Sequence, residues 1–81
     1  PDVFDSVVRV LEHGAEKYGR NNWSQAETLL EAKHRYGAAL MRHAFAALCG
    51  EYLDDGEGGT GEPHLSCVIV NALFLLSYGE I

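Results

Sequence analysis

The sequence has few cysteines, few prolines and little basic charge. Two of its 81 residues are proline and two are cysteine. Both cysteines, Cys49 and Cys67, lie in apolar segments with helical spacing, which is not the pattern of a secreted disulfide scaffold. Six basic residues against twelve acidic ones give a net charge of -6, whereas nucleic-acid-binding surfaces are normally basic. We therefore expect a reducing, cytoplasmic compartment and no nucleic-acid partner.

The sequence also lacks a long apolar run. Its longest apolar stretch, residues 65–76, contains Ser66 and Asn71 and is too short to cross a bilayer. The first residues lack the basic flank and apolar run of a secretory signal. These features predict no membrane partner.

The length limits the chain to one domain. A domain of this size buries only roughly 60% of the surface of its unfolded chain, so a partner subunit would add stability. The chain starts at Pro1 rather than at methionine, which is typical of a fragment of a longer protein. We expect one all-α domain over residues 1–81.

Several catalytic and binding motifs are absent from the sequence. There is no glycine-rich phosphate loop followed by Lys-Ser or Lys-Thr, and residues 54–63 lack the ligand order of an EF-hand. An adjacent His-Asp pair and a serine nucleophile in an elbow motif are also missing. Any catalytic or binding residues must therefore be arranged in a motif other than these.

Three segments show helical periodicity. The first follows Asp2 and should stop at Gly19. The second begins with the capping box of Ser24 and Glu27, runs to about Leu53, and should break or bend between residues 31 and 37. The third, from about residue 64 to 78, is apolar on nearly every side and needs cover on every side. The pattern predicts an all-α fold, a small bundle of three to four helices, completed by a homodimer or higher homo-oligomer.

Acidic residues gather where the second helix is expected to end. Glu51 and Asp54 are three residues apart, so on a helix they would share a face, and Asp55 follows directly. Carboxylate oxygens are the ligands that Mg and Mn prefer, which makes this group a candidate metal site. The alternative is an exposed acidic helix end.

The third helix begins with a second polar set, His64, Cys67 and Asn71, which fall on one helical face. We favour a site role for Asn71, because a buried amide without partners costs about 1 to 3 kcal/mol. Cys67 is more typical of core packing, and no second matching pair supports a structural zinc site. His43 is either a contact to phosphate or a partly buried histidine with a neighbouring partner, and Arg42 is a candidate for neutralising phosphate.

Several short motifs, taken together in order, resemble the N-terminal domain of phage-type dATP/dGTP diphosphohydrolases. They are Lys-Tyr-Gly-Arg-Asn-Asn-Trp at residues 17–23, Arg-His at 42–43, Gly-Glu-Tyr-Leu-Asp at 50–54, His64, and Asn-Ala-Leu-Phe-Leu-Leu at 71–76. That family is similar to the all-α, MazG-like nucleoside triphosphate pyrophosphatases. The resemblance covers nearly the whole chain.

The resemblance implies a metal-dependent pyrophosphohydrolase that converts a purine nucleoside triphosphate to monophosphate and pyrophosphate with Mg or Mn, in the host cytoplasm if the protein is viral. Glu51 and Asp54 would be the catalytic metal ligands, and His64 and Asn71 would line the same site. The implied substrate-binding residues are Lys17, Tyr18, Asn21, Asn22, Trp23, Arg42 and His43.

The sequence departs from the MazG-like pattern at one place. Only one acid pair is clear, and His64, Cys67 and Asn71 stand where a second acid pair is expected, with Cys67 at a position where we expect histidine. An alternative function therefore stays open. In it, the chain is a non-enzymatic helical module that binds or regulates another protein and keeps the fold with an incomplete metal site.

Overall fold

A computed structural model describes residues 3–18 and 29–77, except for the side chains of residues 15–18 and 29. The chain forms helix α1 (Val3–Tyr18), the short helix α2 (Leu29–Ala32), a π-helical turn (Lys33–Gly37), helix α3 (Ala38–Leu48) and helix α4 (His64–Leu76). The described residues include no strand, only an isolated bridge between Leu53 and Pro63. The prediction of a small all-α bundle is confirmed. The expected helix stop at Gly19 and the capping box at Ser24 lie outside the described residues.

The second helix is continuous from Leu29 to Leu48. The residues at its two internal junctions, Ala32 and Gly37, both have helical backbone angles. The irregularity predicted between residues 31 and 37 is the π-helical turn, which widens the helix without ending it.

Helix α3 ends five residues earlier than the sequence pattern predicted. The Gly50 N–H donates to the Ala47 carbonyl and the Glu51 N–H donates to the Ala46 carbonyl, which is the Schellman arrangement. Gly50 has a φ of 99°, a conformation that glycine adopts without a steric cost. The predicted end at Leu53 was wrong because this glycine stops the helix first.

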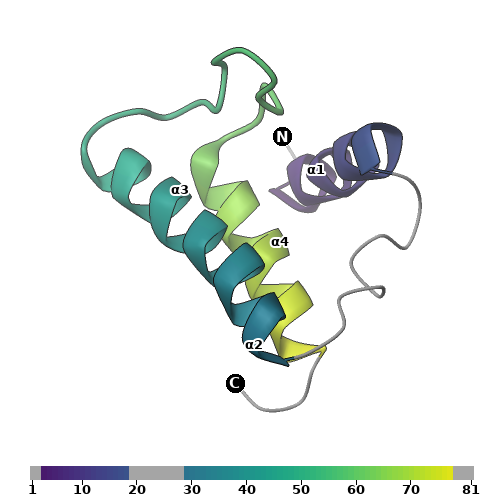
Figure 1. Cartoon of the computed structure of the whole chain (residues 1–81). Coiled ribbons are helices and arrows are strands. Elements are labelled where there is room, and N and C mark those ends of the chain that lie inside the picture. Colours follow the sequence, from purple (N-terminus) through teal and green to yellow (C-terminus); the bar gives the residue numbers. More distant parts are fainter. Residues whose placement is uncertain (1–2, 19–28, 78–81) are drawn as a thin grey trace.

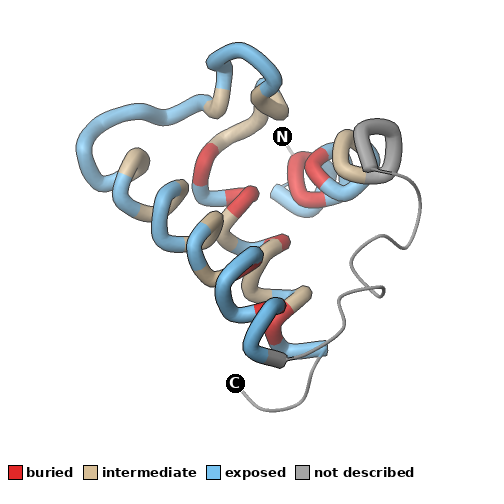
Figure 2. The backbone as a smooth tube through the Cα atoms, in the orientation of Figure 1, coloured by how far each residue is buried: buried red, intermediate tan, exposed pale blue. Residues whose placement is uncertain are grey.

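Helix α4 lies between the other two helical segments. It runs antiparallel to α3, and its other side contacts α1 (Figure 1). Buried residues recur along α4 from its first turn to its last (Figure 2). The bundle is therefore organised around α4.

The core consists of two clusters that share Phe74. One joins α1 to α4 and contains Val7, Val10, Cys67 and Val70. The other joins the second helix to α4 and contains Ala32, Tyr36 and Leu75, with the rings of Tyr36 and Phe74 centred 4.9 Å apart. In the core, α1 therefore packs on the first half of α4, and the start of the second helix packs near the end of α4.

Much apolar surface stays exposed in the single chain. On α4 a stripe at helical spacing is 41 to 58% exposed, and it consists of Leu65, Ile69, Leu73 and Leu76. On α3, Phe45 and Leu48 are 70% and 86% exposed. The structure also contains no helix, within its described residues, that is long and apolar enough to cross a membrane.

Candidate functional site

The loop between α3 and α4 closes on itself through backbone hydrogen bonds. The His64 N–H donates to the Tyr52 carbonyl and the Asp54 N–H donates to the Glu62 carbonyl, each at 2.8 Å. Inside the loop Gly59 passes so close to Asp54 that a Cβ at position 59 would lie 2.4 Å from the Asp54 carbonyl oxygen. Closure of the loop brings Asp54 back to the first turns of α4.

The carboxylate of Asp54 is fixed by Thr60. Its Oδ2 accepts hydrogen bonds from the Thr60 N–H at 3.0 Å and from the Thr60 hydroxyl at 3.1 Å. The Cys67 thiol donates weakly to the same oxygen, with 3.9 Å between Sγ and Oδ2, and lies 3.6 Å from the Thr60 hydroxyl. An acid from the loop and a thiol from α4 therefore face each other.

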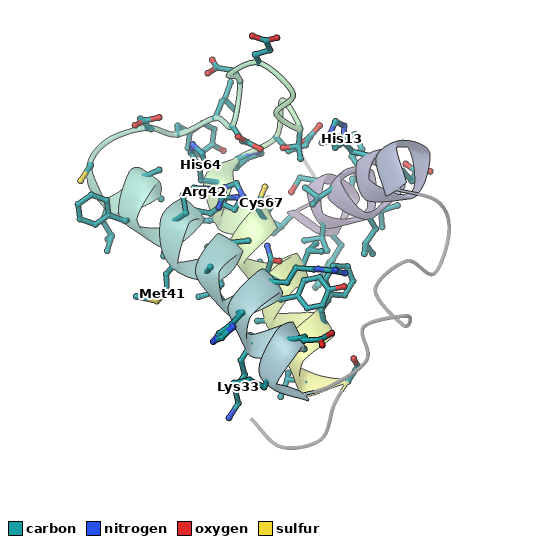
Figure 3. The ribbon with its side chains drawn as sticks, viewed as in Figure 1. His13, Lys33, Met41, Arg42, His64 and Cys67 are labelled. Atoms are coloured by element: carbon teal, nitrogen blue, oxygen red, sulfur yellow. The ribbon has the colours of Figure 1, made fainter. Side chains whose placement is uncertain are left out.

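Two histidines from different helices meet beside this pair. The Nδ1 atoms of His43 on α3 and His64 on α4 are 2.8 Å apart and share a hydrogen bond. The other ring nitrogen of His64, Nε2, lies 3.8 Å from the carboxylate of Glu51, whose side chain is 71% exposed. The side chains of Glu51, His64 and His43 thus form a chain that leads from solvent toward Asp54. Figure 3 shows the side chains of His64 and Cys67 at the loop end of α4.

The surroundings set the protonation of these groups. Burial lowers the pKa of His43, so its imidazole is neutral at pH 7. Burial alone would raise the pKa of Asp54, but the hydrogen bonds from Thr60 and the nearby histidines outweigh it, so the pKa is lowered and the carboxylate is ionised. Burial raises the pKa of the Cys67 thiol.

One group of potential metal ligands emerges from this arrangement. A ring nitrogen of His43, a carboxylate oxygen of Asp54 and the sulfur of Cys67 all lie within 4.8 Å of one another. It is the one such group of three or more among the residues that the structure describes. Its members come from α3, the loop and α4.

The structure brings together some of the predicted site residues and separates others. His43, Asp54 and His64 converge, with Glu51 at the edge. Asp55 is exposed in the loop, and Arg42 is exposed on α3. The Asn71 amide donates to the Cys67 carbonyl, 2.8 Å away in its own helix.

Five predicted substrate contacts have side chains outside the described residues. The backbone of Lys17 and Tyr18 belongs to α1, but their side chains lie outside the described residues. Asn21, Asn22 and Trp23 also lie outside the described residues.

The reasoning that placed Glu51 and Asp54 on one helical face was wrong. Both residues follow the end of α3, so helical spacing does not relate them. Helical spacing does not relate His43 and Asp54 either, because Asp54 lies beyond the end of α3. His43 and Asp54 do lie near each other, but the reason is loop closure.

Sequence reasoning missed Thr60 and treated Cys67 as core packing. Cys67 does belong to the apolar core and is only 2% exposed, yet its sulfur also faces Asp54. The sequence contained one indication of a site role for each of these two residues. Cys67 follows His64 by one helical turn, and Thr60 is the single hydroxyl residue in a glycine-rich acidic loop.

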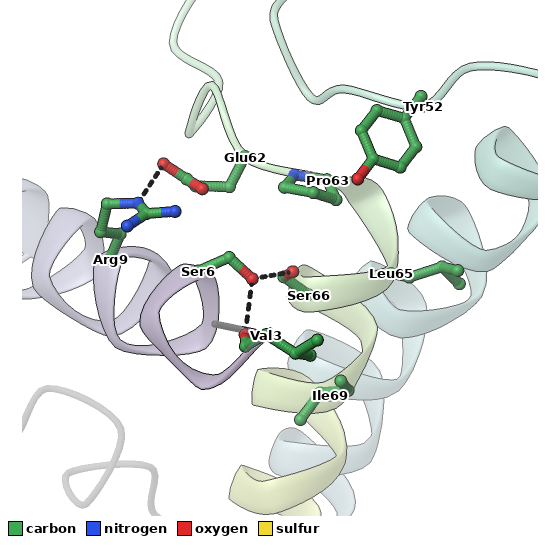
Figure 4. A pocket seen from close by; sticks show the side chains of 9 residues that line it. All are labelled: Val3, Ser6, Arg9, Tyr52, Glu62, Pro63, Leu65, Ser66 and Ile69. Atoms are coloured by element: carbon green, nitrogen blue, oxygen red, sulfur yellow. Dashed lines mark hydrogen bonds and ion pairs between the residues drawn. The ribbon is translucent and has the colours of Figure 1, made fainter. Parts of the chain in front are cut away.

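A separate open cavity of about 400 Å³ lies between the start of α1 and the start of α4 (Figure 4). Four of the polar side chains that line it already have partners. Arg9 bonds Glu62 at 2.9 Å, and Ser66 donates to Ser6, since the hydrogen of the Ser6 hydroxyl goes to the Val3 carbonyl. The convergent group around Asp54, rather than this cavity, is therefore the candidate functional site.

The fold and the site together define a small helical protein with a convergent set of nitrogen, oxygen and sulfur atoms that could bind a metal ion. The family model for the N-terminal domain of dATP/dGTP diphosphohydrolases matches residues 1–80. The chain belongs to this family, as its sequence motifs predicted. Neither the curated proteins nor the solved structures gave a match.

Proposed function

We propose that this chain acts in the hydrolysis of purine deoxynucleoside triphosphates to the monophosphate and pyrophosphate. The observation that carries the proposal is membership of the dATP/dGTP diphosphohydrolase family over residues 1–80. The convergence of His43, Asp54 and His64 at one end of the helix pair supports it, because phosphoryl chemistry depends on ionisable groups in fixed positions.

The chain's own residues suggest a division of roles. Glu51 carries an exposed carboxylate beside His64 and is suited to accept the proton of the attacking water. Arg42 is exposed next to His43 and is suited to neutralise phosphate oxygens. Recognition of the base by Tyr18, Asn21, Asn22 and Trp23, with Lys17 on the phosphates, stays a prediction.

The positions of the acidic residues limit how this chain can bind Mg or Mn. These ions prefer sets of oxygen ligands. Among the described residues, Glu51 and Asp55 do not converge with Asp54, so this chain does not present a complete set of that kind. We therefore propose that Mg or Mn binds together with the triphosphate, as its metal complex. The acidic surface of Glu51, Asp54 and Asp55 would bind this complex, and His64 would lie next to it. Asn71 would contribute its amide oxygen, because its nitrogen already donates within α4.

The test is release of pyrophosphate from dGTP and dATP by the purified chain with Mg or Mn, beside the variants Glu51→Gln and Glu57→Gln. Loss of the proposed proton acceptor should lower kcat by about 100-fold or more. The melting temperature should not change, because the Glu51 side chain is exposed. Glu57 is an exposed acid of the same loop and serves as the control. Equal activity of the two variants would contradict the role of Glu51.

A second candidate function is a helical module that binds or regulates another protein. The separation of Glu51 and Asp55 from Asp54 favours it, since an incomplete acid set is what a non-catalytic relative would retain. If neither dGTP nor dATP shifts the melting temperature or yields pyrophosphate with either metal, this second function replaces the first.

We further propose that the protein assembles as a homodimer or higher homo-oligomer through the exposed stripe of α4. The four apolar side chains of the stripe are about half exposed in the single chain, and a chain of 81 residues gains little stability from its own core. A second copy brings an identical stripe, so two such faces can cover each other.

A further inference from the structure

The ligand atoms of His43, Asp54 and Cys67 are spaced as a small metal site requires. Zinc bonds of about 2.0 to 2.3 Å in a tetrahedral arrangement place neighbouring ligand atoms about 3.3 to 3.6 Å apart. The sulfur of Cys67 is 3.9 Å from Oδ2 of Asp54, and all three ligand atoms lie within 4.8 Å of one another. Binding of an ion would therefore draw the ligand atoms closer together by about 1 Å.

The kind of ligand atoms selects the kind of ion. Thiolate and imidazole suit zinc and related transition metals, whereas Mg takes oxygen ligands and has little affinity for sulfur. An ionised Asp54, an ionised Cys67 and a neutral His43 carry two negative charges in total, which balance one divalent cation. Three protein ligands leave the fourth tetrahedral position for water or a substrate oxygen.

Each ligand has a neighbour that orients it. The backbone N–H and the hydroxyl of Thr60 fix the carboxylate of Asp54, and His64 bonds the ring of His43 through Nδ1. Cys67 is fixed by the core, where its side chain packs with valines of α1 and α4. Such supporting contacts are characteristic of protein metal sites.

We propose that His43, Asp54 and Cys67 bind one zinc ion, with the fourth position open. On binding, the sulfur of Cys67 exchanges its proton for the metal and the proton passes to solvent. The site shares Asp54 with the acidic surface that we propose for the Mg or Mn complex of the triphosphate, but zinc binding to it can be measured without any nucleotide. A failure of the proposed hydrolysis therefore leaves this inference intact, and the reverse also holds.

The test uses cobalt as a spectroscopic probe and zinc as its competitor. The chain is freed of metal with a chelator and titrated with Co²⁺, whose bond to a thiolate gives a charge-transfer absorption. We expect this absorption to saturate at one ion per chain, to disappear when Zn²⁺ is added, and to persist in excess Mg²⁺. Zinc should also raise the melting temperature.

Two cysteine variants provide a matched comparison. Cys67→Ser should abolish the absorption, whereas Cys49→Ser should keep it, because Cys49 is exposed and outside the cluster. His43→Gln and Asp54→Asn should each weaken zinc binding by more than about 100-fold, and Thr60→Val by about 10 to 100-fold. If Cys67→Ser does not fold, His43→Gln and Asp54→Asn decide the question.

Three outcomes would overturn the proposal. The first is an absence of zinc binding at one ion per chain, and the second is loss of the absorption in Cys49→Ser with retention in Cys67→Ser. The third is unchanged zinc affinity in both His43→Gln and Asp54→Asn.

Discussion

Thr60 has a larger role than its size suggests, because its polar groups make three hydrogen bonds. Its hydroxyl and its N–H both donate to Oδ2 of Asp54, and the hydroxyl oxygen accepts from the Glu62 N–H at 3.1 Å. These bonds keep the Asp54 carboxylate ionised and in one position while the loop around it contains several glycines. The geometry of the site therefore depends on a residue that is not itself a candidate ligand.

Replacing Thr60 with valine tests this dependence at the scale of one side chain. Valine has the same shape but no hydroxyl, so Asp54 loses one hydrogen bond and the Glu62 N–H loses its acceptor. We expect the free energy of unfolding to fall by about 1 to 3 kcal/mol, measured by urea denaturation. Thr60→Ser keeps the hydroxyl and should lose less than half as much. Equal losses in the two variants would mean that the methyl group, not the hydroxyl, is important.

At the scale of elements, the end of α3 decides where the acidic residues lie. Gly50 stops the helix in a left-handed conformation, and the chain then leaves α3 and returns through the loop. Had α3 continued to Leu53, Glu51 would project from a helix instead of lying beside His64. The position of a single glycine thus sets the relation between α3, the loop and α4.

Two glycine substitutions should change stability in opposite directions. Gly50→Ala places an alanine at a φ of 99°, which should lower the free energy of unfolding by about 1 to 2 kcal/mol. This cost comes from the backbone conformation alone, because a Cβ there meets nothing within 4 Å. Gly14 lies within α1, and a Cβ there also meets nothing within 4 Å. Gly14→Ala should therefore raise the free energy of unfolding by about 0.5 to 1 kcal/mol. Thermal and urea denaturation of both variants measure this difference. A neutral Gly50→Ala would contradict the assigned role of the C-terminal turn of α3.

At the scale of the whole molecule, the described chain leaves much of its apolar surface in contact with water. α4 packs on α3 along one side and on α1 along another, and its remaining side carries the exposed stripe. Apolar patches of this kind are uncommon on proteins that work as monomers. A second copy is the occupant that we propose for this face.

Light scattering or sedimentation tests the proposed assembly. We expect the wild-type chain to be dimeric or larger at micromolar concentration, and Ile69→Glu combined with Leu73→Glu to give a monomer, because two buried carboxylates in the interface would oppose association. Val8→Glu on α1 is the control, because Val8 lies outside the α4 stripe and its exposed fraction of 49% matches the 48% of Leu73. A monomeric wild-type chain, or equal dissociation in the control, would contradict an interface on α4.

The sequence by itself determined the helices, the glycine-rich loop and the family. These features depend on local preferences and on residue order. Apolar periodicity predicted α1 and α4, the irregularity predicted between residues 31 and 37 is the π-helical turn, and the four glycines and one proline of residues 54–63 do not favour a helix. Local preferences act over a few neighbouring residues. The end of α3 at Gly50 is also a local feature, and a prediction that gave this glycine more weight than the apolar pattern would have found it.

Only the tertiary structure decided which side chains meet. His43, Asp54 and Cys67 are separated by 11 and 13 residues and come from different elements. Their convergence requires α3 packed on α4 and a loop closed by hydrogen bonds at both ends, such as those from His64 to Tyr52 and from Asp54 to Glu62. No spacing rule relates residues across a loop, because loop closure depends on long-range contacts. For that reason the sequence predicted the acids as one helical pair, whereas the fold groups one of them with a histidine and a cysteine.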